Sequence, residues 1–201
     1  MSTRTTLRTT GVAVRAMLVF TVVLGLGYTL LITGVGQLVL PWQANGSLVD
    51  NARGETVGSA LIGQSWTDAD GSPLRQYFQS RPSAAGDGYD GAASSGSNYG
   101  SENDHLVNAI EERQASISAL DGVDVADIPA DAVTASASGL DPHISPAYAL
   151  LQVSRVASAR GLAEDEVRAL VEAHIQQRDL GYLGEPRVNV LELNLALDAH
   201  R

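Results

Sequence analysis

AMLVFTVVLGLGYTLLITGVGQLVL, residues Ala16–Leu40, is an apolar stretch that contains no charged side chain. As an α-helix it would be about 37 Å long, which exceeds the roughly 30 Å hydrocarbon core of a bilayer and leaves room for tilt. A cleaved signal peptide has a shorter apolar region that ends in small residues, whereas Pro41 and Trp42 follow this one. The stretch therefore predicts a transmembrane helix that remains part of the protein.

The arginines on either side of this stretch predict its orientation. Arg4, Arg8 and Arg15 precede it, and no basic residue follows it before Arg53. The cytoplasmic flank of a span carries the excess of positive charge, and Trp42 suits the outer interface. We therefore expect a cytoplasmic N-terminus over residues 1–15, a single transmembrane helix over 16–40 and one extracytoplasmic domain over 41–201.

Small residues recur at every fourth position of the predicted helix. Thr21, Gly25, Thr29 and Thr33 would share one face. Small side chains at this spacing let a second helix approach closely within a membrane. Glycine and threonine are also tolerated in spans that have no partner, but an anchor alone would be served equally well by leucine. The pattern favours a partner helix.

The composition excludes several kinds of chemistry. The chain has no cysteine and no lysine, so it forms no disulfide, thiolate nucleophile, Schiff base or lysine-containing phosphate loop. All 23 acidic residues follow Leu40, together with 10 of the 13 basic residues, so that this part carries a net charge of −13. Such a domain is a poor partner for nucleic acid. Solubility is the simplest reason for its acidity.

Short-range signals predict an α+β fold in which the span is followed by one mixed α/β domain. Residues 47–49 and 56–62 are expected as strands around a turn at 51–54. Residues 64–103 lack periodicity and are expected to be irregular, and residues 129–139 to be a connection. Cap residues Asn103, Ser145 and Asn189 introduce helices. The expected helices are 104–120, 146–160, 164–176 and, with a strand as the alternative, 190–199.

Asp141 and His143 stand on either side of Pro142 and are the strongest candidates for chemistry. They could orient a serine or bind a cation. A turn stabilised by Asp141 and fixed by the neighbouring prolines is the interpretation that we favour. The four histidines show no spacing typical of a zinc helix, and no metal site is expected.

Two other patterns predict binding sites only weakly. The run from Ser94 to Gly100, SSGSNYG, could cradle an anion through backbone amides, but no lysine follows it. The helices between Ser145 and Gln176 superficially match a helix-turn-helix. Their acidity argues against DNA and favours ordinary helical packing.

Six segments stand in the order and spacing of a known family. The chain resembles the C subunit of Kdp-type potassium-transporting ATPases from the end of the span to its C-terminus. The resemblance rests on six segments taken together, each at its own place in the chain. They are QANGSLV (43–49), GSALIGQ (58–64), YFQSRPSAAG (77–86), GSNYG (96–100), TASASGLDPHISP (134–146) and GEPRVNVLELNLALD (184–198).

The resemblance implies a non-catalytic accessory subunit of a high-affinity, ATP-driven potassium uptake pump in the bacterial cell membrane. Its partners would be a channel-like potassium-binding subunit, a P-type ATPase subunit and a small single-span subunit. The complex handles potassium, while this subunit would act in assembly and as a catalytic chaperone that raises the ATP affinity of the ATPase subunit. ATP is thus implied by the resemblance alone. The chain itself has no Asp-Lys-Thr-Gly phosphorylation motif.

We expect the domain to contribute interface or shape-defining residues rather than catalytic ones. One alternative is a signal-anchored extracytoplasmic serine hydrolase, with Ser145 or Ser138 as nucleophile beside His143 and Asp141. Another is a structural domain whose partner is the cell envelope. The residues expected to serve the subunit are Gln43, Asn45, Arg81, Pro82, Ser83, Asn98, Asp141, His143, Asn189 and Asn194.

Overall fold

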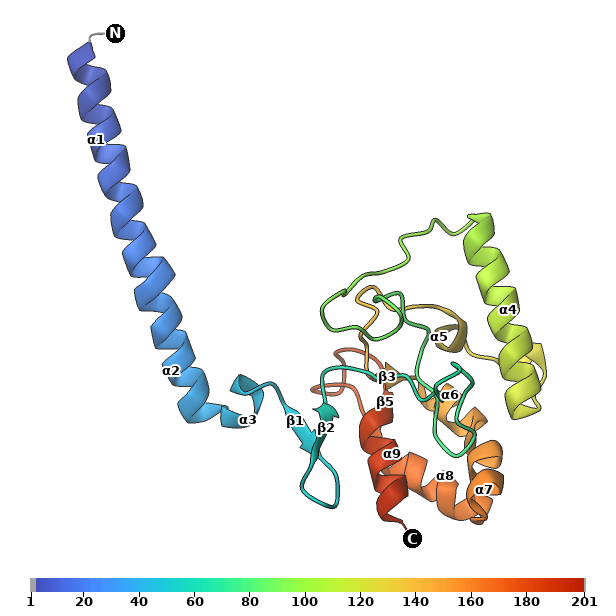
Figure 1. The fold of residues 1–201 in the computed structure, drawn as a ribbon. Coiled ribbons are helices and arrows are strands. Elements are labelled where there is room, and N and C mark those ends of the chain that lie inside the picture. The colour runs from blue at the N-terminus through green and yellow to red at the C-terminus, as the bar shows by residue number, and fades with distance from the viewer. Residues whose placement is uncertain (1–2, 201) are drawn as a thin grey trace. The chain divides into compact units, whose positions relative to one another are not determined.

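The computed structural model describes residues 3–200, and the chain divides into two compact units. The first unit ends at Leu48 and contains a long apolar helix. The second begins at Val49 and contains a domain of mixed helices and strands (Figure 1). This architecture confirms the predicted fold class.

The helix of the first unit has three consecutive parts. They are α1 (Thr3–Phe20), the π-helical η1 (Thr21–Tyr28) and α2 (Thr29–Val39). Its stretch Thr5–Val39 is long and apolar enough to cross a membrane, which confirms the predicted helix. The helix begins before Ala16 because no proline interrupts the preceding residues. Within η1, Gly25 and Gly27 lack Cβ atoms, and such residues tolerate departures from α geometry.

A compact turn follows α2. Pro41 opens the short helix α3 (Pro41–Ala44), in the first helical position that suits proline. The Asn45 side chain folds back and donates Nδ2 to Pro41 O at 2.6 Å and to Gln37 Oε1 at 3.1 Å. Trp42 Nε1 donates to Leu48 O at 2.9 Å. Asn45 therefore defines the shape of this turn.

The second unit opens with a hairpin. Its strands are β1 (Leu48–Asp50) and β2 (Thr56–Ser59), and the Asn51 side chain closes the turn by accepting from the backbone amides of Arg53 and Glu55. The predicted strands are confirmed, but β2 stops at Ser59 rather than residue 62. It stops because Ile62 N donates back to Ser59 O at 3.1 Å and turns the chain.

A three-stranded antiparallel sheet was not expected from the sequence. It contains β3 (His143–Ile144), β4 (Ile175–Gln176) and β5 (Arg187–Asn189), in the order β3-β5-β4. Val188 is central, since it pairs with Ile144 on one side and Ile175 on the other. The predicted helix 164–176 is therefore wrong at its end, because Ile175 pairs in the sheet.

Cap residues fix most helix boundaries as predicted. Asn103 and Ser145 accept backbone hydrogen bonds from the first turns of their helices, and Asn189 Oδ1 accepts from Glu192 N at 3.2 Å. Left-handed Gly122 and Gly161 end the helices whose last residues are Asp121 and Arg160. The Asn189 cap begins the last helix, which is confirmed over the strand alternative. The helices are α4 (Asp104–Asp121), η2 (Val125–Asp127), α5 (Ala130–Val133), α6 (Pro146–Leu151), α7 (Val153–Arg160), α8 (Glu164–Ala173) and α9 (Val190–Ala199).

Two further predictions need correction. The connection predicted at 129–139 contains α5, whose Ala132 and Val133 are buried in the core. The single helix predicted over 146–160 is divided at Gln152, where the backbone departs from regular helical geometry. Both differences arise because tertiary packing outweighs weak local propensity.

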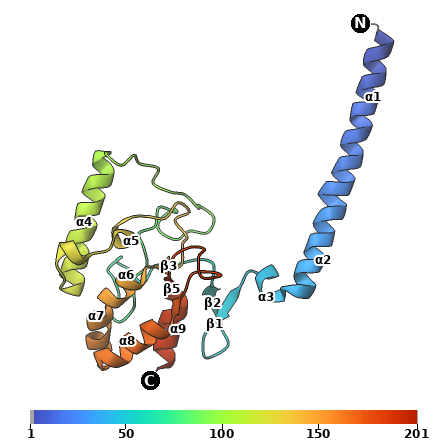
Figure 2. The ribbon, with the colours of Figure 1, turned by 180° about the vertical axis from the view of Figure 1, so that it is seen from behind.

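The core lies around α9. Leu193 and Leu197 are fully buried and belong to one apolar cluster with Val156 of α7, Val171 of α8 and Phe78. Helix α9 contacts α8 and β5, which the views from opposite sides also show (Figure 2). Phe78 comes from the irregular part of the chain, so that this part contributes to the core.

Buried amides of the helices hold the irregular segment in place. Asn194 accepts from Phe78 N at 2.9 Å and donates to Phe78 O at 3.0 Å, as a neighbouring strand would. Asn189 Nδ2 donates to Ala60 O at 2.8 Å. Buried backbone groups need such partners. The two asparagines therefore serve the shape of the domain.

Gln152 and Arg155 extend this support. Gln152 Oε1 accepts from Gln79 N at 2.6 Å, and Arg155 Nη1 donates to the carbonyls of Arg75 and Tyr77 at 2.6 and 2.9 Å. Arg155 Nε also donates to Asp121 Oδ1 at 2.6 Å, with both side chains 1% exposed. The buried ion pair Arg155–Asp121 thus joins α7 to the end of α4, beside the irregular segment.

Candidate functional site

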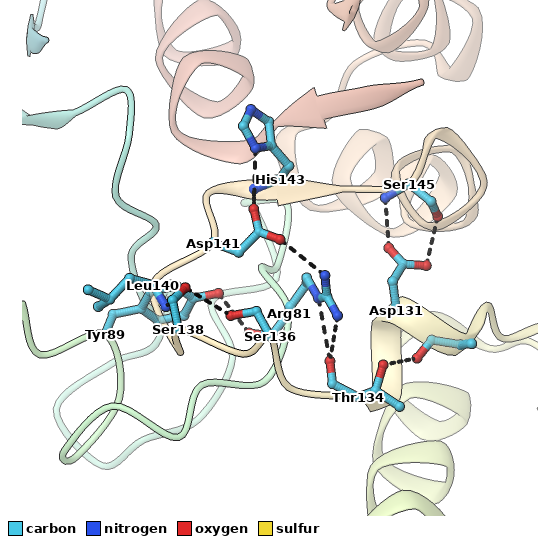
Figure 3. A network of polar contacts seen from close by, with 11 residues as sticks. Arg81, Tyr89, Asp131, Thr134, Ser136, Ser138, Leu140, Asp141, His143 and Ser145 are labelled. Atoms are coloured by element: carbon cyan, nitrogen blue, oxygen red, sulfur yellow. Dashed lines mark hydrogen bonds and ion pairs between the residues drawn. The ribbon is translucent and has the colours of Figure 1, made fainter. Parts of the chain in front are cut away.

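Arg81, Asp141 and His143 form a polar cluster on the surface of the domain (Figure 3). Arg81 comes from the irregular segment, His143 begins β3, and Asp141 lies two residues before that strand. Arg81 Nη1 lies 3.1 Å from Asp141 Oδ2, and its Nε and Nη2 donate to Thr134 O at 3.4 and 3.3 Å. The three side chains are 22–29% exposed, so they remain accessible.

Asp141 organises the cluster. Its Oδ1 accepts from His143 N at 3.0 Å and lies 3.2 Å from His143 Nδ1. Burial alone would raise the pKa of Asp141. The hydrogen bonds from His143, together with the charges of His143 and Arg81, outweigh burial and hold the pKa of this carboxyl below its usual value. The turn predicted around Asp141 is present.

Ser83 and Tyr89 fix the loop beneath the cluster. Ser83 Oγ donates to Gly139 O at 2.6 Å and accepts from Ala85 N and Tyr89 N. Tyr89 Oη donates to Arg81 O at 2.8 Å, and burial raises the pKa of Tyr89 to about 12. Gly139 has φ +66°, and a Cβ there would lie 2.7 Å from Ala85 N. The close packing of these loops leaves the cluster little freedom to move.

Two shallow hollows flank the cluster, and Arg81 and Asp141 line both. The first, of about 660 Å³, also involves Leu61 and Ile62, which are exposed. The second, of about 570 Å³, runs past His143 to residues 184–187. Both are wide open, so they fit the side chains of a protein surface better than an enclosed small molecule.

The hydrolase alternative finds no support in this geometry. Ser145 Oγ donates to Asp131 Oδ1 at 2.8 Å and caps α6 through Tyr148 N, rather than facing His143. Ser138 Oγ accepts from Leu140 N at 3.1 Å. A serine nucleophile needs a hydrogen-bonded base. Within residues 3–200, no hydrogen bond joins either serine to His143.

Neither the run Ser94–Gly100 nor the two hollows fit a nucleotide. The run Ser94–Gly100 packs against another loop: Ser95 N donates to Ser138 O at 3.0 Å, and a Cβ on Gly96 would lie 2.9 Å from Ala137 O. This packing engages the amide of Ser95 and leaves no room for phosphate beside Gly96. The two hollows are lined by the carboxylates Asp131, Asp141 and Glu185 as well as by arginines, and these negative charges disfavour a phosphate group. Among the described residues, no three histidines or carboxylates are grouped to hold a metal ion.

The comparison with protein families identifies the chain. A family model described as "KdpC: K+-transporting ATPase, c chain" matches residues 10–199. The chain belongs to the KdpC family. Potassium-transporting ATPase KdpC subunits similar to it include those of Caulobacter vibrioides strain NA1000 / CB15N, 54% identical over 93% of this chain and 91% of the relative, and Kineococcus radiotolerans, 55% identical over 90% and 88%. That of Mycobacterium tuberculosis strain ATCC 25177 / H37Ra is 50% identical over 92% and 95%. The resemblance stated from the sequence is confirmed.

The structure of this KdpC-family chain brings together some of the predicted residues and separates others. Arg81, Ser83, Asp141 and His143 meet in one region, and Pro82 joins Arg81 to Ser83. Three others have local or internal contacts: Asn98 donates to Gly96 O, and Asn189 and Asn194 are buried. Gln43 and Asn45, like Thr21, Gly25, Thr29 and Thr33, lie in the first unit.

Sequence reasoning missed the polar residues of the core. Gln152, Arg155 and Asp121 are all buried, although only apolar residues were assigned to the faces of these helices. Gln152 and Arg155 stand three positions apart within a helical run that is rich in apolar residues, LLQVSRVASA, and so share a face with core residues. That spacing was the available signal.

Replacing Asp141 by asparagine is expected to reduce the free energy of unfolding by about 1–2 kcal/mol at neutral pH, since a half-buried charged hydrogen-bond acceptor is lost. The folded-state pKa of Asp141 is lowered, so its stabilisation is present above the ordinary value of 3.8 and is lost as the pH falls through the lower folded-state value. Urea unfolding between pH 3 and about 7 measures this. A pH-independent difference between the proteins would contradict the charge argument.

Proposed function

We propose that the chain is the non-catalytic accessory subunit of a high-affinity, ATP-driven potassium uptake pump of the Kdp type. The observation that carries the proposal is the family match over residues 10–199, which covers most of the apolar helix and nearly all of the domain. The relatives that match it are named as KdpC subunits of potassium-transporting ATPases. Ser145 and Ser138 hydrogen-bond to groups other than His143, which supports a binding role over a hydrolytic one.

The chain anchors in the bacterial cell membrane through its single span, with residues 1–15 in the cytoplasm and the domain outside. The charge distribution supports this orientation, since three arginines precede the apolar stretch and all 23 acids follow it. The partners are a channel-like potassium-binding subunit, a P-type ATPase subunit and a small single-span subunit.

The apolar helix packs on a helix of the potassium-binding subunit through Thr21, Gly25, Thr29 and Thr33. A Cβ placed on Gly25 would meet only Thr21 Cγ2, at 3.9 Å, so Gly25 and Thr21 lie side by side and the space beside them is open. Lipid does not drive apolar helices together, so close backbone approach at small residues supplies the contact.

The docking face of the domain is the cluster Arg81, Asp141 and His143 with its two hollows. It sits on the external surface of the potassium-binding subunit. Arg81 and His143 both pair with Asp141, so a partner meets a preformed surface with little further ordering. Any rise in the ATP affinity of the ATPase subunit then follows from assembly, because this orientation puts the domain on the opposite side of the membrane from cytoplasmic ATP.

Affinity purification of the tagged full-length chain from potassium-starved cells in mild detergent tests the proposal. Recovery of a P-type ATPase and a multi-span potassium-binding subunit supports it. If the chain is recovered without them although both are expressed, the accessory-subunit proposal fails.

Gly25→Leu is expected to reduce recovery of the potassium-binding subunit by about tenfold or more, because the side chain holds the helices apart. Gly27→Leu is the matched control, since Gly27 lies in the same π-helical segment but outside the four-residue repeat. Quantitative immunoblotting of purified complexes measures the effect. Equal losses in both variants would indicate general damage to the helix and contradict the proposed face.

A further inference from the structure

The connection between β4 and β5 ends in an exposed apolar tip, which comprises residues 180–183. Leu180, Tyr182 and Leu183 are 81%, 69% and 48% exposed. Figures 1 and 2 show this loop extending away from α7 and α8. The domain's apolar core does not include the three side chains. Exposed apolar groups gathered at one point mark a contact with another molecule or a membrane.

The hairpin presents the tip in a fixed form. Asp179 and Leu183 exchange two backbone hydrogen bonds of 2.9 Å, which close the loop. Leu180 has φ +53°, a left-handed conformation in which the Cβ atom of a leucine is strained. Glycine or asparagine would adopt it with less strain. The local backbone therefore does not explain why leucine stands there.

The charges around the tip cancel. Arg178 pairs with Glu185, and Arg187 Nη2 lies 3.5 Å from Asp179 Oδ2. The domain as a whole is strongly acidic and is repelled by anionic lipid headgroups. The tip, by contrast, is apolar and locally neutral, so it can approach such headgroups without an electrostatic penalty.

We infer that the tip inserts into the headgroup boundary of the bilayer that holds the chain's own span. Three side chains bury far less than the roughly 1,000 Å² that a stable protein interface requires, and a bilayer needs no matching pocket. Residues 40–47 alone separate α2 from β1, and even a fully extended chain of that length reaches only about 30 Å. This tether keeps the domain near the lipid, so a weak contact suffices.

The absence of native cysteine allows a direct test. Tyr182→Cys is labelled with a polarity-sensitive fluorophore in the full-length chain, reconstituted in vesicles of phosphatidylcholine and phosphatidylglycerol. Lipids that carry a quencher just below the headgroups are added in one sample, and lipids with a quencher deep in the acyl chains in another. Val125→Cys is the matched control, since Val125 is 45% exposed on a different part of the domain.

The expected result is a blue-shifted emission at position 182 that the shallow quencher extinguishes more strongly than the deep one, with neither effect at position 125. Leu180→Ser combined with Leu183→Ser should abolish the quenching at 182. A label at 182 that remains as water-exposed as the control overturns the inference. So does a label shielded only when the other pump subunits are present, without lipid quenching, since the contact is then with protein. The chain alone suffices for the test, so its failure would leave the proposed pump subunit intact.

Discussion

Replacing Arg155 by methionine is expected to lower the free energy of unfolding by about 3–5 kcal/mol, the cost of breaking a buried ion pair from one side. The variant leaves the Asp121 carboxylate without its partner and removes the donor from the carbonyls of Arg75 and Tyr77. Burial already raises the pKa of Asp121 although Arg155 opposes it. Without the guanidinium that pKa rises further, so the loss should shrink as the pH falls and Asp121 takes up a proton.

Urea unfolding of the full-length chain in mild detergent measures this loss. Arg168→Met is the control, because Arg168 lies on the exposed side of α8. Adding Asp121→Leu to Arg155→Met should recover part of the stability, since an apolar pair replaces an orphaned charge. If the double variant were less stable by the sum of both single losses, the two residues would not act as a pair.

Asn194→Ala is expected to cost about 2–4 kcal/mol, because it leaves both the amide and the carbonyl of Phe78 buried without partners. Asn194→Asp tests the same contact with almost no change in volume. An aspartate can accept from Phe78 N, but its second oxygen would face Phe78 O and repel it. Both variants should therefore unfold at lower urea concentration.

Asn108→Ala is the control for the alanine variant, since Asn108 also lies within a helix but is exposed. Surface changes of this kind usually alter stability by less than about 0.5 kcal/mol. An Asn194→Asp variant as stable as the original chain would show that the hydrogen bond to Phe78 O contributes little.

Local signals in the sequence were sufficient for most of the helices. The apolar stretch Ala16–Leu40 and the caps at Asn103, Ser145 and Asn189 act within one or two turns, and the structure contains the corresponding helices. The sheet gave no such signal. Its strands have two or three residues, and β3 pairs with β5 across more than forty positions, so their existence depends on tertiary packing.

The candidate site shows the same limit. Asp141 and His143 could be selected because they flank one proline, and their contact is local. Arg81 was selected from a family segment, but its bond to Asp141 joins residues 60 positions apart. Likewise, no pattern in residues 75–79 indicates that Gln152, Arg155 and Asn194 bind their backbone, because those partners follow much later in the chain.

The backbone of residues 75–79 thus lies against a template of side chains supplied by α7, by α9 and by Gln152 between α6 and α7. During synthesis residues 75–79 leave the ribosome well before the helices whose side chains bind them. The segment has no regular secondary structure that it could form without those helices. Residues 75–79 therefore lack these side-chain partners until the last helix has left the ribosome. A chain that ended before Asn189 would retain the apolar helix but would lack the side chains that bind the backbone of Phe78 and Ala60. Quality-control proteases that recognise unfolded segments would therefore encounter a long unfolded segment.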